Sequence, residues 1–432
     1  MKKLKVLFDA EILISVWAGQ SIGTGIYYTA YNIFQQLLLR NDIDVYIYSS
    51  KRNFGRLRYA LENKFPELYQ KQIKLDYISE LYARWQYCWF SCEKKRKKTI
   101  FIKMKQGIIR NLLQRPIKTI ASCFKTYRHI ADSFDCYFSP LYKVPWYVED
   151  NKNIKKFIIL YDAIPLLFPD ISIISSSKSW YMNLIRQINK QNYYFAISEC
   201  AKADFIQNVP QIDKNKLSII PLAANSNFYP DYNLQRNQSI RKKYCIPLNR
   251  RYFLSVCTIE PRKNLIFAIS NYLNFIKKNN ITDLVLVLAG GHWKKLSPEV
   301  VAAINELGFK DRIIQTGYVD ERDLASLYSN AECFVYPSLY EGFGLPPLEA
   351  MQCGTPVITS NTSSLPEVVG DAAIMIDPHD NDALIKAYEK IYFDGGLRKE
   401  LSQKGIKRAK LFSWQKCTDI IVNKMKEVSG EL

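Results

Sequence analysis

Residues Cys333 to Ser360 read CFVYPSLYEGFGLPPLEAMQCGTPVITS, and the order of residue types in this stretch decides the fold. The apolar run Cys333–Tyr336 predicts a buried strand, and Val357–Thr359 predicts the strand that follows it. Between them, Pro346-Pro347 indicates the start of a helix, because proline is tolerated in the first helical turn. Gly354 then ends this helix. Strand, helix and strand in this order predict an α/β fold with parallel strands.

Two glutamates, Glu341 and Glu349, flank the predicted helix start with seven residues between them, and we expect Glu349 in the first helical turn. Gly342 and Gly344 allow the backbone to turn tightly and to come close to a ligand. A helix start suits a phosphate through its free N–H groups and its dipole, whereas carboxylates suit the hydroxyls of ribose or a hexose. The segment therefore predicts a site for a ligand with phosphate and sugar. The alternative is an ordinary strand-turn-helix unit with two surface glutamates.

The composition sets the general class of the protein. The length of 432 residues predicts two domains of roughly 200 residues each, and a hydrophobic content of 48% is enough for packed cores. The sequence has no run of about 18 apolar residues that would predict a transmembrane helix. The ten cysteines include no C-x-x-C pair, and only three histidines are present, which argues against a zinc site. Scattered cysteines of this kind are typical of reduced thiols, so we expect a cytoplasmic location.

The positive charge is concentrated in one segment. The formal net charge of the chain is +19, and residues 84–128 contain thirteen lysines and arginines but one acidic residue, Glu93. Apolar and aromatic residues recur between these cations at near-helical spacing, which predicts a basic amphipathic insertion at the surface of an anionic membrane. The alternative is a solvated helical excursion packed on the first domain. We expect no nucleic-acid partner, because no DNA- or RNA-binding motif accompanies the charge.

Short apolar runs recur along both halves of the chain and predict two series of parallel strands covered on both faces. The first series is predicted at 4–8, 44–48, 136–138, 157–161, 193–197 and 217–220. The second is predicted at 252–257, 284–289, 312–315, 333–336, 356–359 and 373–376. A loop with Gly23 and Gly25 follows the first strand and precedes a helix predicted at 26–39, as in a Rossmann-like half. Polar composition predicts a linker near 222–245.

Charged residues follow two other predicted strands. Arg262 and Lys263 come shortly after the strand at 252–257 and could stabilise the charge of a departing nucleotide diphosphate. The alternative is a pair of surface cations at a helix start, which the helix dipole disfavours. Asp162 follows the strand at 157–161, where it either joins an active site or caps a turn.

These motifs together resemble those of family 4 retaining glycosyltransferases, which have the GT-B fold. The resemblance rests on Pro337-Ser338, Glu341-Gly342-Phe343-Gly344, Pro346, Glu349-Ala350, Gly354, Pro356-Val357 and the run Thr258 to Asn264. It implies two Rossmann-like domains that face each other across a cleft. Residues 1–222 would form the acceptor-side domain, with the basic insertion at about 84–128. Residues 223–411 would bind the nucleotide sugar, and 412–432 would form a C-terminal helix that packs back on the first domain.

The resemblance also implies roles for single residues. Glu341, Arg262, Lys263 and Asp162 would be catalytic, with Glu341 beside the donor sugar. Glu349 would bind the ribose, the backbone at Gly342, Phe343, Gly344 and Leu345 would bind the diphosphate, Gly23 and Gly25 would lie near it, and Val319 would lie near the base. No metal and no cofactor are implied. The chain departs from many relatives at Tyr161, where they have histidine, so that either the tyrosine hydroxyl takes this role or the role is dispensable.

The implied function is metal-independent, retaining transfer of a hexose from a nucleotide sugar to a lipid-linked or polysaccharide acceptor. The family branch favours mannose from GDP-mannose and a place in O-antigen, capsule or exopolysaccharide synthesis, at the inner face of the plasma membrane. One alternative is a catalytically silent GT-B-fold protein that binds a membrane or a polyanion. Another is a nucleotide-sugar epimerase, or a phosphorylase, for which no pyridoxal lysine is evident.

Overall fold

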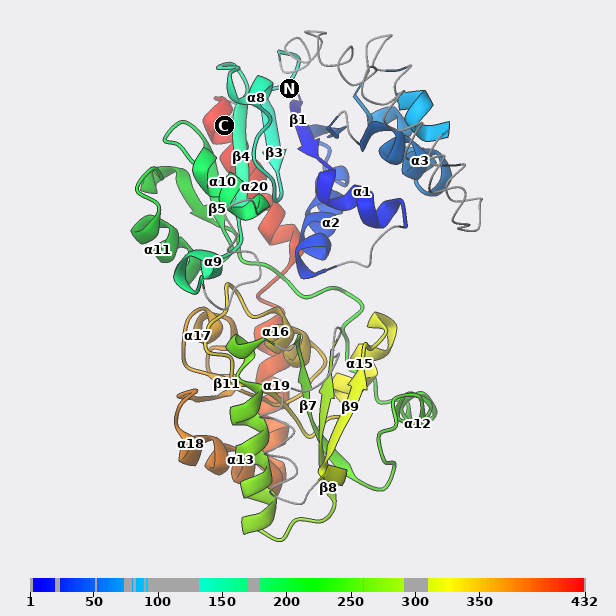
Figure 1. Ribbon diagram of the computed structural model, residues 1–432, viewed down its shortest axis with the longest axis vertical. Helices are drawn as coiled ribbons and strands as arrows, with labels where there is room; N and C mark the ends of the chain where they lie inside the picture. Colours follow the sequence, from blue (N-terminus) through cyan, green and yellow to red (C-terminus); the bar gives the residue numbers. More distant parts are fainter. Residues whose placement is uncertain are drawn as a thin grey trace, which may run out of the picture.

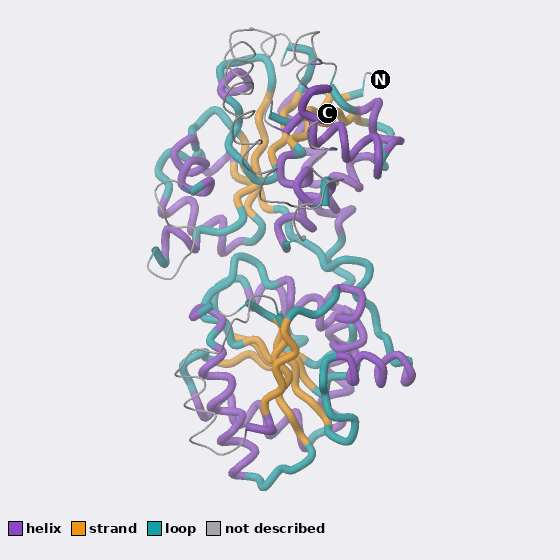
Figure 2. The backbone as a smooth tube through the Cα atoms, turned by 45° about the vertical axis from the view of Figure 1, so that its right-hand side comes forward, coloured by secondary structure: helices purple, strands orange, loops and turns teal. Residues whose placement is uncertain are grey.

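The computed structural model describes residues 3–19, 24–50, 53–73, 80, 83–88, 91, 132–169, 179–258, 260–290 and 310–430. Gly23 and most of the predicted insertion at 84–128 lie outside these residues. Figures 1 and 2 show two layers of strands, one in each half of the molecule, with helices packed around them. The predicted α/β class is confirmed.

The first sheet has six parallel strands in the order β2-β1-β3-β4-β5-β6. Its strands are β1 (Leu4–Asp9), β2 (Ile43–Tyr48), β3 (Cys136–Ser139), β4 (Lys155–Leu160), β5 (Tyr193–Ala196) and β6 (Leu217–Ile219). The helices of this half are α1 (Glu11–Trp17), α2 (Gly25–Leu38), α3 (Phe54–Lys64), η2 (Pro66–Lys71), α8 (Trp146–Glu149), α9 (Ile164–Leu167), α10 (Trp180–Gln187), α11 (Glu199–Asn208) and η4 (Lys214–Lys216).

The second sheet also has six parallel strands, in the order β12-β11-β10-β7-β8-β9. Its strands are β7 (Arg251–Val256), β8 (Leu284–Ala289), β9 (Ile313–Gly317), β10 (Cys333–Tyr336), β11 (Val357–Ser360) and β12 (Ile374–Ile376). The helices are α12 (Leu234–Lys243), η5 (Pro261–Lys263), α13 (Leu265–Lys278), η6 (Lys310–Arg312), α15 (Glu321–Ser329), α16 (Leu345–Gln352), α17 (Leu365–Val369), α18 (Asn381–Phe393), α19 (Gly395–Ala409) and α20 (Trp414–Ser429). Strands β8, β10 and β11 are buried along their whole length, as expected for a parallel sheet covered on both faces.

The last helix, α20, returns from the second half and packs on α2 and β4 of the first half (Figure 1). Ser413 caps its start by accepting from the N–H of Lys416 at 3.1 Å. The apolar face of α20 consists of Cys417, Ile421, Val422 and Met425, all fully buried. Burial of this stripe provides most of the free energy that stabilises the packing of α20 on the first half, because apolar area removed from water is the dominant stabilising term. No helix in the described parts of the chain has the length and apolar character needed to span a membrane.

Two local predictions differ in detail from the structure. The predicted linker at 222–245 is without helix or strand up to residue 233, and its second part is the helix α12, which Asn233 caps by accepting from the N–H of Arg236 at 2.9 Å. Glu349 lies in the second turn of α16 rather than the first, because the helix begins at Leu345. Gly344 precedes this start with a φ of +125°, a backbone conformation that favours glycine.

Candidate active site

The predicted site residues lie where strands of the two sheets end. Asp162 follows β4 of the first sheet, Lys263 belongs to η5 after β7, and Glu341 follows β10. Strands β7 and β10 are neighbours in the second sheet, so their carboxyl ends bring Lys263 and Glu341 together. In open parallel sheets this edge is where ligands bind.

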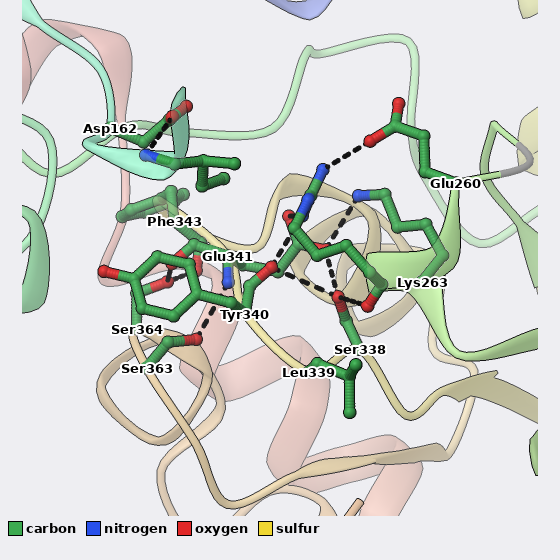
Figure 3. Close-up of polar contacts among 12 residues, drawn as sticks. Asp162, Glu260, Lys263, Ser338, Leu339, Tyr340, Glu341, Phe343, Ser363 and Ser364 are labelled. Atoms are coloured by element: carbon green, nitrogen blue, oxygen red, sulfur yellow. Dashed lines mark hydrogen bonds and ion pairs between the residues drawn. The ribbon is translucent and has the colours of Figure 1, made fainter. Parts of the chain in front are cut away.

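Glu341 is the centre of a buried charge cluster with Arg262 and Lys263. Figure 3 shows Glu341 beside Lys263. Its Oε1 accepts from Lys263 Nζ at 2.7 Å, and its Oε2 lies 2.7 Å from Arg262 Nη1. The three side chains are 10–12% exposed. Burial alone would raise the pKa of Glu341, but Lys263 and Arg262 outweigh it and lower the pKa to about 2. The glutamate is therefore ionised at all physiological pH values.

Neighbouring groups fix the orientation of the three charged side chains. Tyr336 and Ser338 donate their hydroxyls to Glu341 Oε1 at 2.8 and 2.6 Å. Lys263 Nζ also donates to Tyr336 Oη at 2.6 Å, and Arg262 donates to the carbonyl of Tyr340 at 2.6 Å. Because every charge has a partner, the cluster keeps its geometry before any ligand arrives.

The Gly342 backbone lies against the strand end that carries Asp162. A Cβ atom at Gly342 would lie 2.7 Å from Asp162 Cβ and 3.2 Å from the Tyr161 carbonyl oxygen. Asp162 Oδ1 accepts from the Ile164 N–H at 3.1 Å, and burial raises the pKa of the Asp162 carboxyl. The two halves of the molecule therefore meet at Gly342 without room for a side chain.

The Tyr161 side chain does not extend into this cluster. Its hydroxyl is buried beside Cys417 of α20, and no hydrogen-bond partner for it occurs among the described residues. Burial raises the pKa of this phenol far above the physiological range. This position favours the interpretation that the role of the histidine in the resembling family is dispensable here over the one that the Tyr161 hydroxyl takes it.

A cavity of about 220 Å³ lies between the two halves. Four of the predicted donor-binding residues line it: Gly25, Val319, Leu345 and Glu349. Tyr318, beside Val319, also lines it, together with Tyr28, Thr29, Asn32, Ala223, Asn225, Phe228, Glu321, Leu324 and Trp414. Ligand pockets that enclose a drug-sized molecule have about 300–1,000 Å³, so this cavity has room for part of a nucleotide sugar.

Glu349 faces this cavity as a partly desolvated carboxyl. Its Oε2 accepts from the Tyr328 hydroxyl at 3.1 Å. Burial raises the pKa of Glu349 to about 7, with a smaller contribution from Glu321, which lines the same cavity. The one sequence feature that could have indicated Glu321 is its place two residues after Val319, at the start of α15.

The turn from Gly342 to Leu345 joins the charge cluster to the cavity. The residue before α16 is Gly344, which has no side chain to cap the first N–H groups of the helix. Pro346 and Pro347 have no N–H, so Leu345 alone supplies an amide N–H from the first three residues of the helix. The Phe343 ring packs edge-on against Phe412 at a centroid distance of 5.9 Å. The ring is therefore engaged in packing, and the backbone of Phe343 is the part that can contact a ligand at this turn.

Replacing Glu349 with glutamine should stabilise the unliganded protein at about pH 8. Between about pH 4.5 and about 7, the folded chain keeps a proton on Glu349 that the unfolded chain has released. The free energy of unfolding of the native sequence therefore falls as the pH rises through this window, by on the order of 2–3 kcal/mol. Glutamine removes this cost and can still accept from Tyr328.

Thermal unfolding of both proteins from about pH 5 to about pH 8 measures this effect. The Tm of Glu349→Gln should exceed that of the native sequence near pH 8, and the difference should vanish near pH 5. Asp9, whose pKa burial raises to about 7, contributes equally to both proteins and cancels. A Tm difference that does not change with pH would show that Glu349 is ionised in the folded chain throughout.

Comparison with known proteins shows a family and several relatives that this chain resembles. The family model described as glycosyl transferases group 1 matches residues 236–408. The serotype-specific mannosyltransferase WbdA of Escherichia coli is 33% identical over 271 residues, which are 61% of this chain and 32% of WbdA. O-antigen chain mannosyltransferase B of Escherichia coli is 32% identical over 277 residues, which are 60% of this chain and 69% of that protein. The chain thus spans about a third of the length of the first of these relatives.

Solved structures share the fold over nearly the whole chain. Sucrose-phosphate synthase from Thermosynechococcus elongatus superposes with a TM-score of 0.67 at 19% identity, over 100% of both chains. The glycosyltransferase WaaG superposes with a TM-score of 0.60 at 14% identity, over 98% of this chain and 99% of WaaG. The predicted GT-B fold, with two Rossmann-like halves, is confirmed.

Proposed function

Because this chain belongs to the glycosyl transferases group 1 family, we propose that it transfers a hexose from a nucleotide sugar to a lipid-linked or polysaccharide acceptor. One observation carries this proposal. The segment from Glu341 to Glu349 places one carboxylate on two buried cations and the other in a cavity, and the α16 start joins the two places. A nucleotide sugar presents sugar, diphosphate and ribose in the same order.

The proposed donor therefore follows this segment. The nucleoside would occupy the cavity, with its ribose hydroxyls on Glu349 and its base near Val319. The diphosphate would lie at the backbone of Gly342 to Leu345, with the glycine loop at Gly23 and Gly25 close by. The hexose would point toward Glu341 and Asp162, where the two halves meet.

Arg262 and Lys263 would stabilise the departing diphosphate. When the bond between the anomeric carbon and the diphosphate oxygen breaks, its electron pair stays on the phosphate, and nearby cations lower the energy of that charge. An acceptor hydroxyl would attack from the face that the phosphate leaves and give its proton to the departing phosphate. The new bond keeps the configuration of the old one, which makes the enzyme retaining, and Arg262 and Lys263 would supply the positive charge that a metal ion supplies elsewhere.

The relatives favour particular substrates. Both relatives are named mannosyltransferases, and the name of O-antigen chain mannosyltransferase B also contains O-antigen, so we propose GDP-mannose as donor and an O-antigen-like glycan as acceptor. We also propose the domain division at 1–222, 223–411 and 412–432, with α20 as the returning helix. The family match does not favour the silent membrane-binding protein or the epimerase.

A screen of nucleotide sugars tests this function. Isothermal titration with GDP-mannose, UDP-glucose and the free nucleotides should identify one donor that binds in the micromolar range, and incubation of that donor with a mannose-terminated oligosaccharide should release nucleoside diphosphate. The glycosidic bond of the product should have the anomeric configuration of the donor, as nuclear magnetic resonance can show. Binding of a donor without any transfer or hydrolysis would contradict the proposal.

We further propose that the chain works at the cytoplasmic face of an anionic membrane, through residues 84–128. Five consecutive cations, Lys94 to Lys98, carry much of this charge. Neutralising them to glutamine should reduce sedimentation with phosphatidylglycerol vesicles, and added salt should weaken the binding of the native sequence in the same way, because each basic residue near an anionic surface adds about 1 kcal/mol. Vesicles of phosphatidylcholine serve as the control. Equal sedimentation of the two proteins would remove the membrane from the proposal.

A further inference from the structure

The turn that carries Glu341 is held from both halves of the molecule. On its own side, Glu341 N–H donates to Ser363 Oγ at 2.9 Å, and Ser364 Oγ donates to the Glu341 carbonyl at 2.9 Å. Arg262 donates to the Tyr340 carbonyl. These contacts fix the turn to the second half, as the close-up in Figure 3 shows.

Polar contacts reach the same turn and its neighbour α17 from α11 of the first half, and we call those of Ser198, Tyr340 and Glu367 the α11 clasp. Cys200 Sγ also lies 3.5 Å from the Tyr340 hydroxyl. Ser198, which caps α11, donates its hydroxyl to the Gly342 carbonyl at 2.7 Å. The Tyr340 hydroxyl donates to Asp204, one turn into α11. The Glu367 carboxylate accepts from the N–H groups of Glu199 and Cys200 at 2.9 and 3.1 Å.

The clasp connects groups that are themselves well anchored. Glu367 sits in α17, and its backbone carbonyl accepts from Arg408 Nη2 at 2.7 Å. Its carboxylate lies at the positive end of a helix of ten residues, which favours the negative charge. The Tyr340 ring packs against Phe168, which follows α9, at a centroid distance of 5.4 Å.

The chemistry of the clasp differs from that of the α20 contact between the halves. The α20 helix holds the first half through a fully buried apolar stripe, which is costly to separate. The clasp consists of hydrogen bonds, which water can replace at a net cost of about 0.5–1.5 kcal/mol each, or 1.5–3 kcal/mol for those to a charged group. Contacts of this kind suit an interface that opens to admit a donor and closes again for the reaction.

We propose that Glu367 and Tyr340 are positioning residues for hexose transfer. Their hydrogen bonds to α11 hold the two halves together. Because Glu341 and Gly342 are one and two residues after Tyr340, these bonds also hold the Glu341–Gly342 turn against Asp162. This inference rests on the proposed transferase function. Neither residue needs to contact the donor, because the nucleoside cavity is lined by other residues.

Steady-state kinetics with GDP-mannose and a mannose-terminated oligosaccharide test the clasp. Glu367→Ala should lower kcat by about tenfold or more, because misplacement of reacting groups by about 1 Å costs up to about 100-fold. The KM for GDP-mannose should change less than about threefold, since the donor-binding residues are untouched. Glu367→Gln should recover a large part of kcat, because its carbonyl oxygen can still accept from α11. Tyr340→Phe, which keeps the ring on Phe168, should lower kcat by a smaller factor.

Glu389→Ala is the matched control. Glu389 also accepts two hydrogen bonds, from Lys278 and Asn279 at 2.9 and 3.1 Å, but all three residues lie within the second half. Its kcat should equal that of the native sequence. In addition, hydrogen exchange in the presence of GDP should be faster at the Glu199 and Cys200 amides in Glu367→Ala than in the native sequence.

The outcomes separate the two proposals. Normal kcat and unchanged amide exchange in Glu367→Ala and Tyr340→Phe, with an active native enzyme, would overturn the positioning role alone. Equal losses of kcat in Glu367→Ala and Glu389→Ala would show that Glu367 contributes to stability in general and does not position the reacting groups. A native enzyme that releases no GDP from GDP-mannose and transfers no other sugar would overturn the transferase function and the clasp with it.

Discussion

Lys263→Met should lower kcat for hexose transfer by about 100- to 1,000-fold, the usual cost of removing one preorganised donor from developing negative charge. Lys263 Nζ lies 2.7 Å from Glu341 Oε1 and 2.6 Å from Tyr336 Oη, and 5.1 Å from the centre of the Tyr336 ring. Methionine keeps the apolar stem over that ring but removes the cation. Steady-state kinetics with the donor identified by the nucleotide-sugar screen measure the loss.

The same substitution also leaves Arg262 as the one cation paired with Glu341 within the described parts of the chain, so stability must be separated from catalysis. Removing one partner of a buried ion pair costs about 3–5 kcal/mol. The double variant Lys263→Met/Glu341→Gln also removes the negative charge that Lys263 balanced and leaves Arg262 paired with Glu260, so its Tm should return toward that of the native sequence while kcat stays low. Lys243→Met, at a surface pair with Asp323, is the matched control and should be fully active. Recovery of kcat in the double variant would show that Lys263 only balances the charge of Glu341 and does not stabilise the departing diphosphate.

The segment from Cys333 to Ser360 could be read correctly because its signals are local. Its apolar strands are short and continuous, and proline and glycine mark the ends of the helix between them. The contact between Lys263 and Glu341 depends on the order of strands in the sheet, which is not a local signal. Strand β10 pairs with β7 although two strands separate them in the chain, and the carboxyl ends of parallel strands share one edge.

Other features have no local signal. The direction of Tyr161 could not be read, because β4 is buried on both faces and its residues show no alternation between core and solvent. The helix α12 was missed because it buries little: Asn237 and Ile240 are its buried residues, too few for a visible helical period. Tyr28 and Glu321 line one cavity from two halves of the chain, which becomes apparent only when the halves are placed together.

Gly342→Ala should reduce kcat/KM for transfer by about 100-fold while guanosine binding changes less than about threefold. Backbone strain is not the cause, since φ at Gly342 lies outside the left-handed region. The added methyl group would instead lie 2.7 Å from Asp162 Cβ and 3.2 Å from the Tyr161 carbonyl, where neither neighbour is the free end of a flexible side chain. The turn and the strand end must therefore move apart, which separates Glu341 from the first half of the molecule.

Kinetics and calorimetry with guanosine distinguish this effect from misfolding. Guanosine binding reports the nucleoside cavity, which Gly342 does not line, and should persist in a folded variant. Gly395→Ala is the control, because a Cβ there meets only the Arg398 guanidinium at 3.5 Å and alanine suits the first residues of α19. Native activity in Gly342→Ala would mean that the close approach of the turn to Asp162 is not the working arrangement, and Asp162 would then lose its place beside the donor sugar.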